Sequence, residues 1–169
     1  MHKEILVIDD NPDIRSLVSN ILKDQNFEVR TAANYDQAVF EINKKLPDLA
    51  IIDIKLDKTD KDGIDLLKLI TQKSKQVPII MISGHATVAI AVEATRLGAY
   101  EFIEKPFSKE KILNYVKRAL ESFELKKEKD LIENKLFHSF DLVGKSPSIM
   151  KVKKIIEKLS TSESRVLIS

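Results

Sequence analysis

The chain has 169 residues and a formal net charge of +2, long enough for one globular domain of about 100–150 residues and a shorter segment. Apolar residues make up 43% and can fill a core, and the absence of Cys excludes disulfides and thiolate metal sites. No apolar run approaches the roughly 20 residues that cross a bilayer, and no signal-peptide cleavage site is present, so we expect a cytoplasmic protein without membrane contact.

The chain opens with a predicted strand followed by a predicted helix. Residues 5–8 form a continuous apolar run, typical of a strand buried on both faces, and this run ends at Asp9 and Asp10. Asn11 and Pro12 predict the start of a helix, because Asn is a preferred N-cap and Pro is tolerated in the first turn.

The alternation of strands and helices continues for about 100 residues. Further strands are expected at 27–32, 48–53, 77–82 and 100–103, with helical patterns around 38–42, 64–70 and 85–97. Gly98 is expected to close the last of these helices. Strict alternation predicts a parallel sheet with helices on both faces.

Polar residues stand where the predicted strands end, and ligands of such sheets bind at this edge. These strand-end residues are Asp9, Asp10, Asp53, Ser83 and Lys105. In the strand order 2-1-3-4-5, strands 1 and 3 are neighbours, so the three carboxylates would lie together and repel one another. A hard divalent cation such as Mg²⁺ prefers oxygen ligands and would relieve this repulsion.

The same set of residues suits phosphoryl transfer. A carboxylate oxygen of Asp53 can attack a phosphoryl group in line and form an acyl phosphate. Catalysis of such a transfer consists mainly of positioning and of neutralising charge. With Mg²⁺ on one phosphoryl oxygen, the Lys105 ammonium would pair with another and the Ser83 hydroxyl would bond a third.

Four pieces of the sequence, in this order and at these strand ends, closely resemble the receiver domain of two-component response regulators: residues 8–12, 53, 83–86 and 98–107. The resemblance covers about residues 3–120. It implies a receiver domain at 1–120 with a flavodoxin-like, doubly wound (βα)5 parallel sheet. It also implies a sensor histidine kinase as partner, and a module that promotes only its own phosphorylation and dephosphorylation.

The resemblance implies roles around the acceptor. Asp53 would accept the phosphoryl group, Asp10 would bind Mg²⁺ directly, and Asp9 would bind it directly or through water. The third protein ligand in this family is a backbone carbonyl two residues after the acceptor, which would be that of Lys55. These assignments give a Mg²⁺ site made of Asp9, Asp10, Asp53 and the Lys55 carbonyl.

The resemblance also implies a switch. Ser83 matches the family's switch hydroxyl, and Phe102 matches the aromatic side chain that swings inward when this hydroxyl moves. Lys105 matches the phosphate-binding lysine, and its bond to Pro106 would be cis, as is typical of the family. Phosphorylation would then change the surface formed by the fourth helix, the fifth strand and the fifth helix.

The loop after Asp53 departs from the family. Members often read D-x-x-M-P-x-x-D-G after the acceptor, whereas this loop reaches Asp62 and Gly63 after two additional residues and lacks the Pro. We expect the site to survive, because the metal ligands precede the insertion. Kinase recognition and the lifetime of the acyl phosphate are the properties expected to differ.

Structural alternatives exist for several of these residues. Asp9 and Asp10 could cap the first helix, a placement that stabilises by about 0.3–1 kcal/mol. Asp62 is expected to cap the third helix, and the acidic loop before it to be solvated rather than to bind a second metal. His85 is expected at the exposed start of the fourth helix, not as a ligand or phosphohistidine.

A long helical pattern begins near Ser108 and meets no Gly or Pro before residue 144. Its apolar positions form a heptad seam and then continue on another register; the seam is Ile112, Val116, Ala119 and Phe123, and the continuation is Leu125, Ile132 and Leu136. We expect a helical linker at 121–141 that contributes to a homodimer.

The carboxy-terminal part is basic, with 14 Lys and Arg against 9 Asp and Glu in residues 109–169, compared with 14 against 17 in residues 1–108. We interpret this excess as a solvated helix face rather than a nucleic-acid site. Residues 142–169 resemble the opening of the AAA+ ATPase domain of NtrC-type, sigma-54-dependent activators, without its phosphate-binding loop. The resemblance implies a truncated ATPase start, with DNA and sigma-54 RNA polymerase contacted only through domains missing from this chain.

The leading hypothesis is a phosphorylation-driven receiver that regulates a downstream transcription-activating ATPase. One alternative is a pseudo-receiver that dimerises without phosphorylation, which the complete set of polar residues argues against. Another is a hydrolase of the haloacid-dehalogenase type, but that class places a D-x-D nucleophile after the first strand, whereas Asp9 and Asp10 are adjacent.

Overall fold

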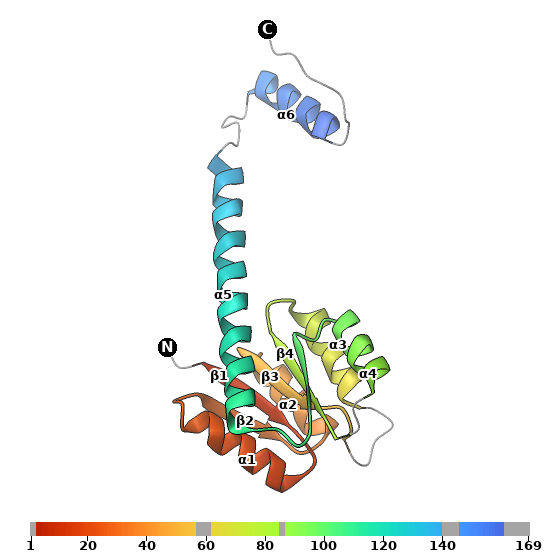
Figure 1. Cartoon of the computed structure of the whole chain (residues 1–169). Helices are drawn as coiled ribbons and strands as arrows, with labels where there is room; N and C mark the ends of the chain where they lie inside the picture. The colour runs from red at the N-terminus through yellow and green to blue at the C-terminus, as the bar shows by residue number, and fades with distance from the viewer. Residues whose placement is uncertain (1–2, 57–61, 85–86, 140–145, 161–169) are drawn as a thin grey trace. The chain divides into compact units, whose positions relative to one another are not determined.

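The computed structural model describes residues 3–56, 62–84, 87–139 and 146–160 (Figure 1). Its elements are β1 (Glu4–Ile8), α1 (Pro12–Lys23), β2 (Glu28–Ala32), α2 (Tyr35–Lys44), β3 (Leu49–Asp53), α3 (Gly63–Lys73), β4 (Ile79–Ser83), α4 (Val88–Arg96), β5 (Glu101–Glu104), α5 (Lys109–Ser139) and α6 (Pro147–Ser160). The chain divides into two compact units, Met1–Lys127 and Glu128–Ser169. The expected domain boundaries after residues 120 and 141 stay predictions.

The first unit contains a five-stranded parallel sheet in the order β2-β1-β3-β4-β5, which confirms the predicted flavodoxin-like fold. β1 and β3 are neighbours, and their register runs from Ile5 opposite Leu49 to Ile8 opposite Ile52. This crossover places the ends of β1 and β3 side by side, as Figure 1 shows. The acidic residues that follow these strands therefore meet at one edge of the sheet.

Two apolar layers pack on the sheet, because successive residues of each strand point to opposite faces. Ile5 and Val7 of β1 face a layer completed by α1 and α5, whereas Leu6 and Ile8 face a layer completed by α2, α3 and α4. All five residues of β1, of β3 and of β4 are buried. Burial on both faces explains why these strands are continuous apolar runs in the sequence.

The N-caps of α1 and α3 are formed by Asn11 and Asp62. The Asn11 side chain caps α1, accepting hydrogen bonds from the N–H groups of Asp13 at 2.9 Å and Ile14 at 3.4 Å. The alternative that Asp9 or Asp10 caps this helix is therefore wrong, because the cap lies one residue further along. Asp62 caps α3 as predicted, in a reciprocal capping box with Asp65.

The fourth helix is shorter than predicted. α4 begins at Val88 after its N-cap Thr87, because the Thr87 hydroxyl accepts a hydrogen bond from the Ile90 N–H. The prediction for His85 lies outside the described residues. Gly98 follows the end of α4 with a φ of 104°, a backbone conformation that favours Gly, so it closes the helix as predicted.

The apolar positions of α5 divide into a buried part and an exposed part. Ile112, Val116 and Ala119 are fully buried in the layer shared with α1. This heptad spacing therefore packs the helix on its own sheet. Leu125 and Ile132, on the second register, are 67% and 59% exposed. The register changes where the helix no longer has a sheet to cover. No helix in the described part of the chain is long and apolar enough to cross a membrane.

Candidate functional site

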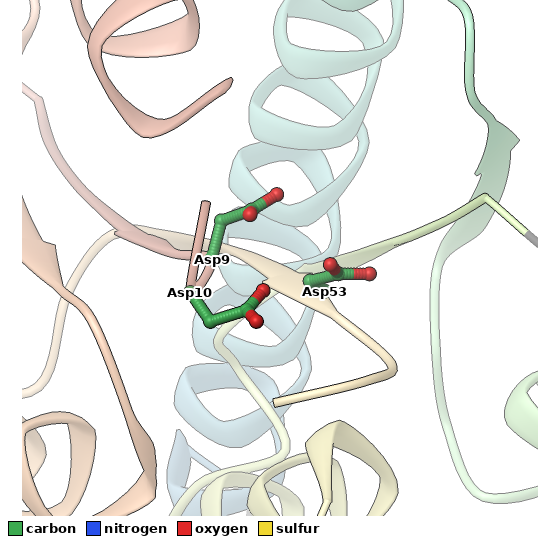
Figure 2. Close-up of side chains that lie close together, drawn as sticks. All are labelled: Asp9, Asp10 and Asp53. Carbon is green, nitrogen blue, oxygen red and sulfur yellow. The ribbon is translucent and has the colours of Figure 1, made fainter. Parts of the chain in front are cut away.

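Three carboxylates meet at the carboxyl edge of the sheet. Asp9 and Asp10 directly follow β1, and Asp53 is the last residue of β3. One carboxylate oxygen from each residue lies within 4.8 Å of the others, and Figure 2 shows the three groups close together. Asp9 and Asp53 are only 2% and 6% exposed, whereas Asp10 is half-buried. The predicted grouping of these acids is therefore present.

Lys105, which directly follows β5, also reaches this cluster. Its Nζ donates hydrogen bonds to Asp9 Oδ2 and to Asp53 Oδ2, each at 2.8 Å. The Lys105 backbone N–H also donates to the Ser83 carbonyl at 2.8 Å, which fixes the lysine against the end of β4. The Lys105–Pro106 bond is cis, as predicted. One cation thus neutralises part of the charge of two buried carboxylates.

The proton affinities of the site follow from burial and charge. Burial raises the pKa of Asp53 above its usual range, the charges of Asp9 and Asp10 raise it further, and the bond to Lys105 only partly opposes this shift. Burial alone would lower the pKa of Lys105, but its hydrogen bonds to Asp53 and Asp9 outweigh burial and raise it. Lys105 therefore stays charged at neutral pH. Ionisation of Asp53 is less favourable in the folded chain than that of an exposed aspartate.

Asp9 and Asp10 differ in how far their carboxylates are already used. Asp9 Oδ1 accepts a hydrogen bond from the Asn11 N–H at 2.9 Å, and Asp9 Oδ2 accepts the bond from Lys105. Among the described residues, no hydrogen bond or ion pair engages the Asp10 carboxylate. Asp10 is thus the acid of this cluster whose oxygens are most available to a new ligand.

The donor set fits a hard divalent cation. Three carboxylates within reach of a single ion, one of them with a raised pKa, are a concentration of negative charge that Lys105 balances only in part. Oxygen donors of this type suit Mg²⁺, which binds through one or two carboxylates and keeps several waters. Lys55 follows the cluster with an exposed side chain, and the role expected of its backbone carbonyl stays a prediction.

Ser83 and Phe102 come from the neighbouring strands β4 and β5. Ser83 ends β4 and is 2% exposed. Phe102 of β5 stands opposite Met81 of β4, two residues before Ser83, and both Phe102 and Met81 belong to the layer under α2, α3 and α4. The two residues thus stand on adjacent strands, two residues apart in register, and their role as a switch stays a prediction.

Gly63 approaches the backbone of Asp53 more closely than any side chain would allow. A Cβ at position 63 would lie 2.1 Å from the Asp53 carbonyl oxygen and 2.9 Å from the Ile54 Cα. The Gly63 N–H also donates to the Ile54 carbonyl at 2.8 Å. The start of α3 is thus locked against the acceptor strand. The residues of the unusual loop, 57–61, lie outside the described part.

Arg15 is a site residue that the sequence patterns did not single out. Its guanidinium donates to the backbone carbonyls of Asp9 at 2.6 Å and Asp10 at 3.3 Å. A helical side chain leans toward the start of its helix, so an Arg in the second turn after an acidic pair can reach that pair. The spacing between this acidic pair and Arg15 was therefore the sequence signal that could have identified Arg15.

The sequence matches the response regulator receiver domain over residues 5–117, most of the first unit. The chain belongs to the response regulator receiver family. The acidic cluster and Lys105 stand at the edge of this receiver fold where β1, β3 and β5 end.

Related receivers belong to longer regulators. The receiver chain is 39% identical over 165 residues to a putative NtrX-like response regulator of Rickettsia bellii, covering 98% of this chain and 34% of that protein. A crystal structure of NtrX from Brucella abortus matches with a TM-score of 0.76 and 40% identity, covering 98% of this chain and 36% of that one. The chain thus spans little more than a third of either relative.

A receiver domain alone is also similar. The solution structure of the beryllofluoride-activated NtrC4 receiver domain dimer has a TM-score of 0.66 and 35% identity, covering 71% of this chain and 98% of that one.

If the site accepts a phosphoryl group, Lys105→Met is expected to slow that transfer by about 100-fold, the scale of losing one preorganised donor to a developing charge. Mg²⁺ should bind at least as tightly, because a competing cation has gone. Labelling from a small phosphodonor and calorimetric Mg²⁺ titration measure the two effects. The matched control is Lys109→Met, which removes an exposed lysine paired with Asp24. Equal labelling by the wild type and Lys105→Met would rule out a direct role for Lys105.

Proposed function

We propose that the chain is a phosphoacceptor module that takes a phosphoryl group from a sensor histidine kinase on Asp53 in the presence of Mg²⁺. The observation that carries this proposal is that Lys105 bonds both Asp9 and Asp53 beside the Asp10 carboxylate, which no described residue bonds. A nucleophile, a fixed cation and a place for a divalent cation are within reach of one another. Each is a requirement of phosphoryl transfer.

The transfer itself uses an oxygen of Asp53. This oxygen attacks the phosphorus of a phosphohistidine, the P–N bond breaks, and the imidazole leaves with the electron pair. Asp53 must be ionised to attack, and its raised pKa makes it a stronger base than an exposed aspartate. Lys105, already 2.8 Å from Asp53 Oδ2, is placed to pair with the incoming phosphoryl oxygens. Bound Mg²⁺, held by Asp10, Asp53, the Lys55 carbonyl and Asp9 directly or through water, would neutralise phosphoryl charge.

The response would pass through Ser83 and Phe102. In this proposal the Ser83 hydroxyl moves to the phosphoryl group, and Phe102 turns inward into the space that it leaves. The surface of α4, β5 and α5 would then change and form a homodimer. Val88 and Val92 of α4 are 83% and 44% exposed, which supports an apolar contact there. The similar NtrC4 receiver forms a dimer when activated by beryllofluoride, which also supports a homodimer here.

The linker would transmit this change. Leu125 and Ile132 are exposed on α5 and seven residues apart, so they would extend the dimer contact along the helix. In a longer protein like the NtrX relatives, the receiver would regulate a transcription-activating ATPase at and beyond residues 142–169. Contacts to DNA and sigma-54 RNA polymerase would belong to those further domains. The proposed regulation involves no contact with a membrane.

The proposed function predicts that the wild-type chain takes up one phosphoryl group from acetyl phosphate or phosphoramidate, only when Mg²⁺ is present. Intact-mass spectrometry should show the gain, and reductive trapping with peptide mapping should place it on Asp53. Beryllofluoride with Mg²⁺ should shift the chain from monomer to dimer in light scattering. A chain that dimerises equally with and without beryllofluoride, and takes up no phosphoryl group, would instead be a pseudo-receiver.

A further inference from the structure

The Arg15 side chain ties the start of α1 to the end of β1. Its Nη1 donates to the Asp9 carbonyl at 2.6 Å and to the Asp10 carbonyl at 3.3 Å. The Arg15 backbone N–H donates to the Asn11 carbonyl at 3.0 Å. One residue therefore holds three consecutive carbonyls of the turn that carries the two acids.

These carbonyls need a partner from outside the sheet. The ladders that β1 forms with β2 and β3 end at Ile8, so the carbonyls of Asp9 and Asp10 lie beyond the paired part of the strand. Asp9 is almost fully buried, and a buried carbonyl without a donor is costly. Both bonds come from Nη1, and the planar guanidinium fixes the directions of the two N–H groups on this nitrogen, whereas those of a lysine ammonium rotate.

We propose that Arg15 is a positioning residue that holds the Asp9–Asp10 turn in the geometry required for binding a divalent cation. The proposal rests on the proposed function, because it concerns the same cation site. Arg15 acts through the backbone: the carbonyls that it binds belong to the residues whose carboxylates form the cluster with Asp53. Without the guanidinium, the turn would be free to rotate its carboxylates away from Asp53.

The sign of the effect separates positioning from simple charge. Arg15 is a cation bonded to the backbone carbonyls of Asp9 and Asp10, so its removal by charge alone would tighten the binding of Mg²⁺. Loss of positioning would instead weaken binding, because misplaced ligands cannot reach the ion together. The two roles therefore predict changes in opposite directions for the same variant.

The experiment is a calorimetric titration of the full chain with Mg²⁺. Arg15→Gln is expected to weaken binding by about tenfold, the lower end of the cost of removing groups that orient metal ligands. Arg15→Lys, which keeps the charge but loses the planar fork, should weaken it less. Arg118→Gln, which removes an exposed charge from α5, is the matched control and should leave binding unchanged. Unchanged or tighter binding by Arg15→Gln would overturn the proposal.

A second readout needs no metal. The Asn11 N–H donates to Asp9 Oδ1 at 2.9 Å, so its hydrogen exchange reports whether the turn is held. Arg15→Gln is expected to speed exchange at Asn11 by about tenfold, while amides in β1 keep their rates. Equal exchange at Asn11 in both proteins would contradict the proposal. A wild type that exchanges slowly at Asn11 but binds no Mg²⁺ would instead refute the cation site of the proposed function.

Discussion

Asp53→Asn is expected to abolish phosphoryl labelling and, at the same time, to stabilise the folded chain at neutral pH. The amide oxygen is a poor nucleophile, so labelling should fall by more than about 100-fold. The folded state gains because a buried charge is removed while Lys105 keeps its bond to Asp9 and can still donate to the amide oxygen. We expect a gain of about 1–2 kcal/mol in the free energy of unfolding without Mg²⁺.

The pH dependence of this gain has a defined sign. The pKa of Asp53 is raised in the folded chain, so the folded state holds this proton more tightly than the unfolded state. The stability that the wild type derives from this proton is fully present below the unfolded pKa and is lost as pH rises through the folded pKa. The advantage of Asp53→Asn should therefore be largest at neutral pH and disappear on acidification.

Urea denaturation at several pH values measures this advantage, and acetyl phosphate with Mg²⁺ measures the labelling. Asp130→Asn, which removes an exposed carboxylate from α5, is the matched control and should change neither. Labelling of Asp53→Asn at the wild-type rate would remove Asp53 as the acceptor. A less stable Asp53→Asn variant at neutral pH would show that burial of this charge carries no net cost.

Gly63→Ala is expected to destabilise the receiver unit by about 2–4 kcal/mol, at the upper end for an inserted methyl group. The new Cβ would lie 2.1 Å from the Asp53 carbonyl oxygen, and its neighbours are backbone atoms that cannot rotate away. Either the start of α3 or the end of β3 must move. Because Asp53 is the last residue of β3, the displacement should also slow phosphorylation of the molecules that remain folded.

The matched control for this substitution is Gly84→Ala, because a Cβ at position 84 would meet nothing within 4 Å. Urea denaturation should show a large shift for Gly63→Ala and a small one for Gly84→Ala. Equal stability of Gly63→Ala and the wild type would mean that the close packing of α3 on the acceptor strand is easily relaxed.

Much of the fold could be predicted because strands buried on both faces must be apolar along their whole length. The runs ending at Asp9, Asp53 and Ser83 were visible for this reason, and parallel pairing then required their ends to share one edge. Element boundaries moved by a few residues where a cap decided them. Thr87 shortened α4, whereas the predicted start of α1 at Asn11 and Pro12 was confirmed.

The seam of α5 shows why periodicity alone was insufficient. A helix packed on a sheet and a helix in a dimer both bury positions three and four residues apart. Ile112, Val116 and Ala119 satisfied either arrangement, and only their burial against β-strand residues decided between them. The exposed Leu125 and Ile132 remain available for a dimer, as the linker hypothesis requires.

By itself, the sequence determined the order of the strands' apolar runs and the acids and lysine at their ends, since these depend on local pattern and chain connectivity. Only the tertiary structure decided that Lys105 bonds both Asp9 and Asp53, while no described residue bonds the carboxylate of Asp10. It also decided that Gly63 touches the Asp53 backbone and that Arg15 holds the acidic turn. These contacts join distant segments or depend on side-chain direction, and neither is encoded in a residue's immediate neighbours.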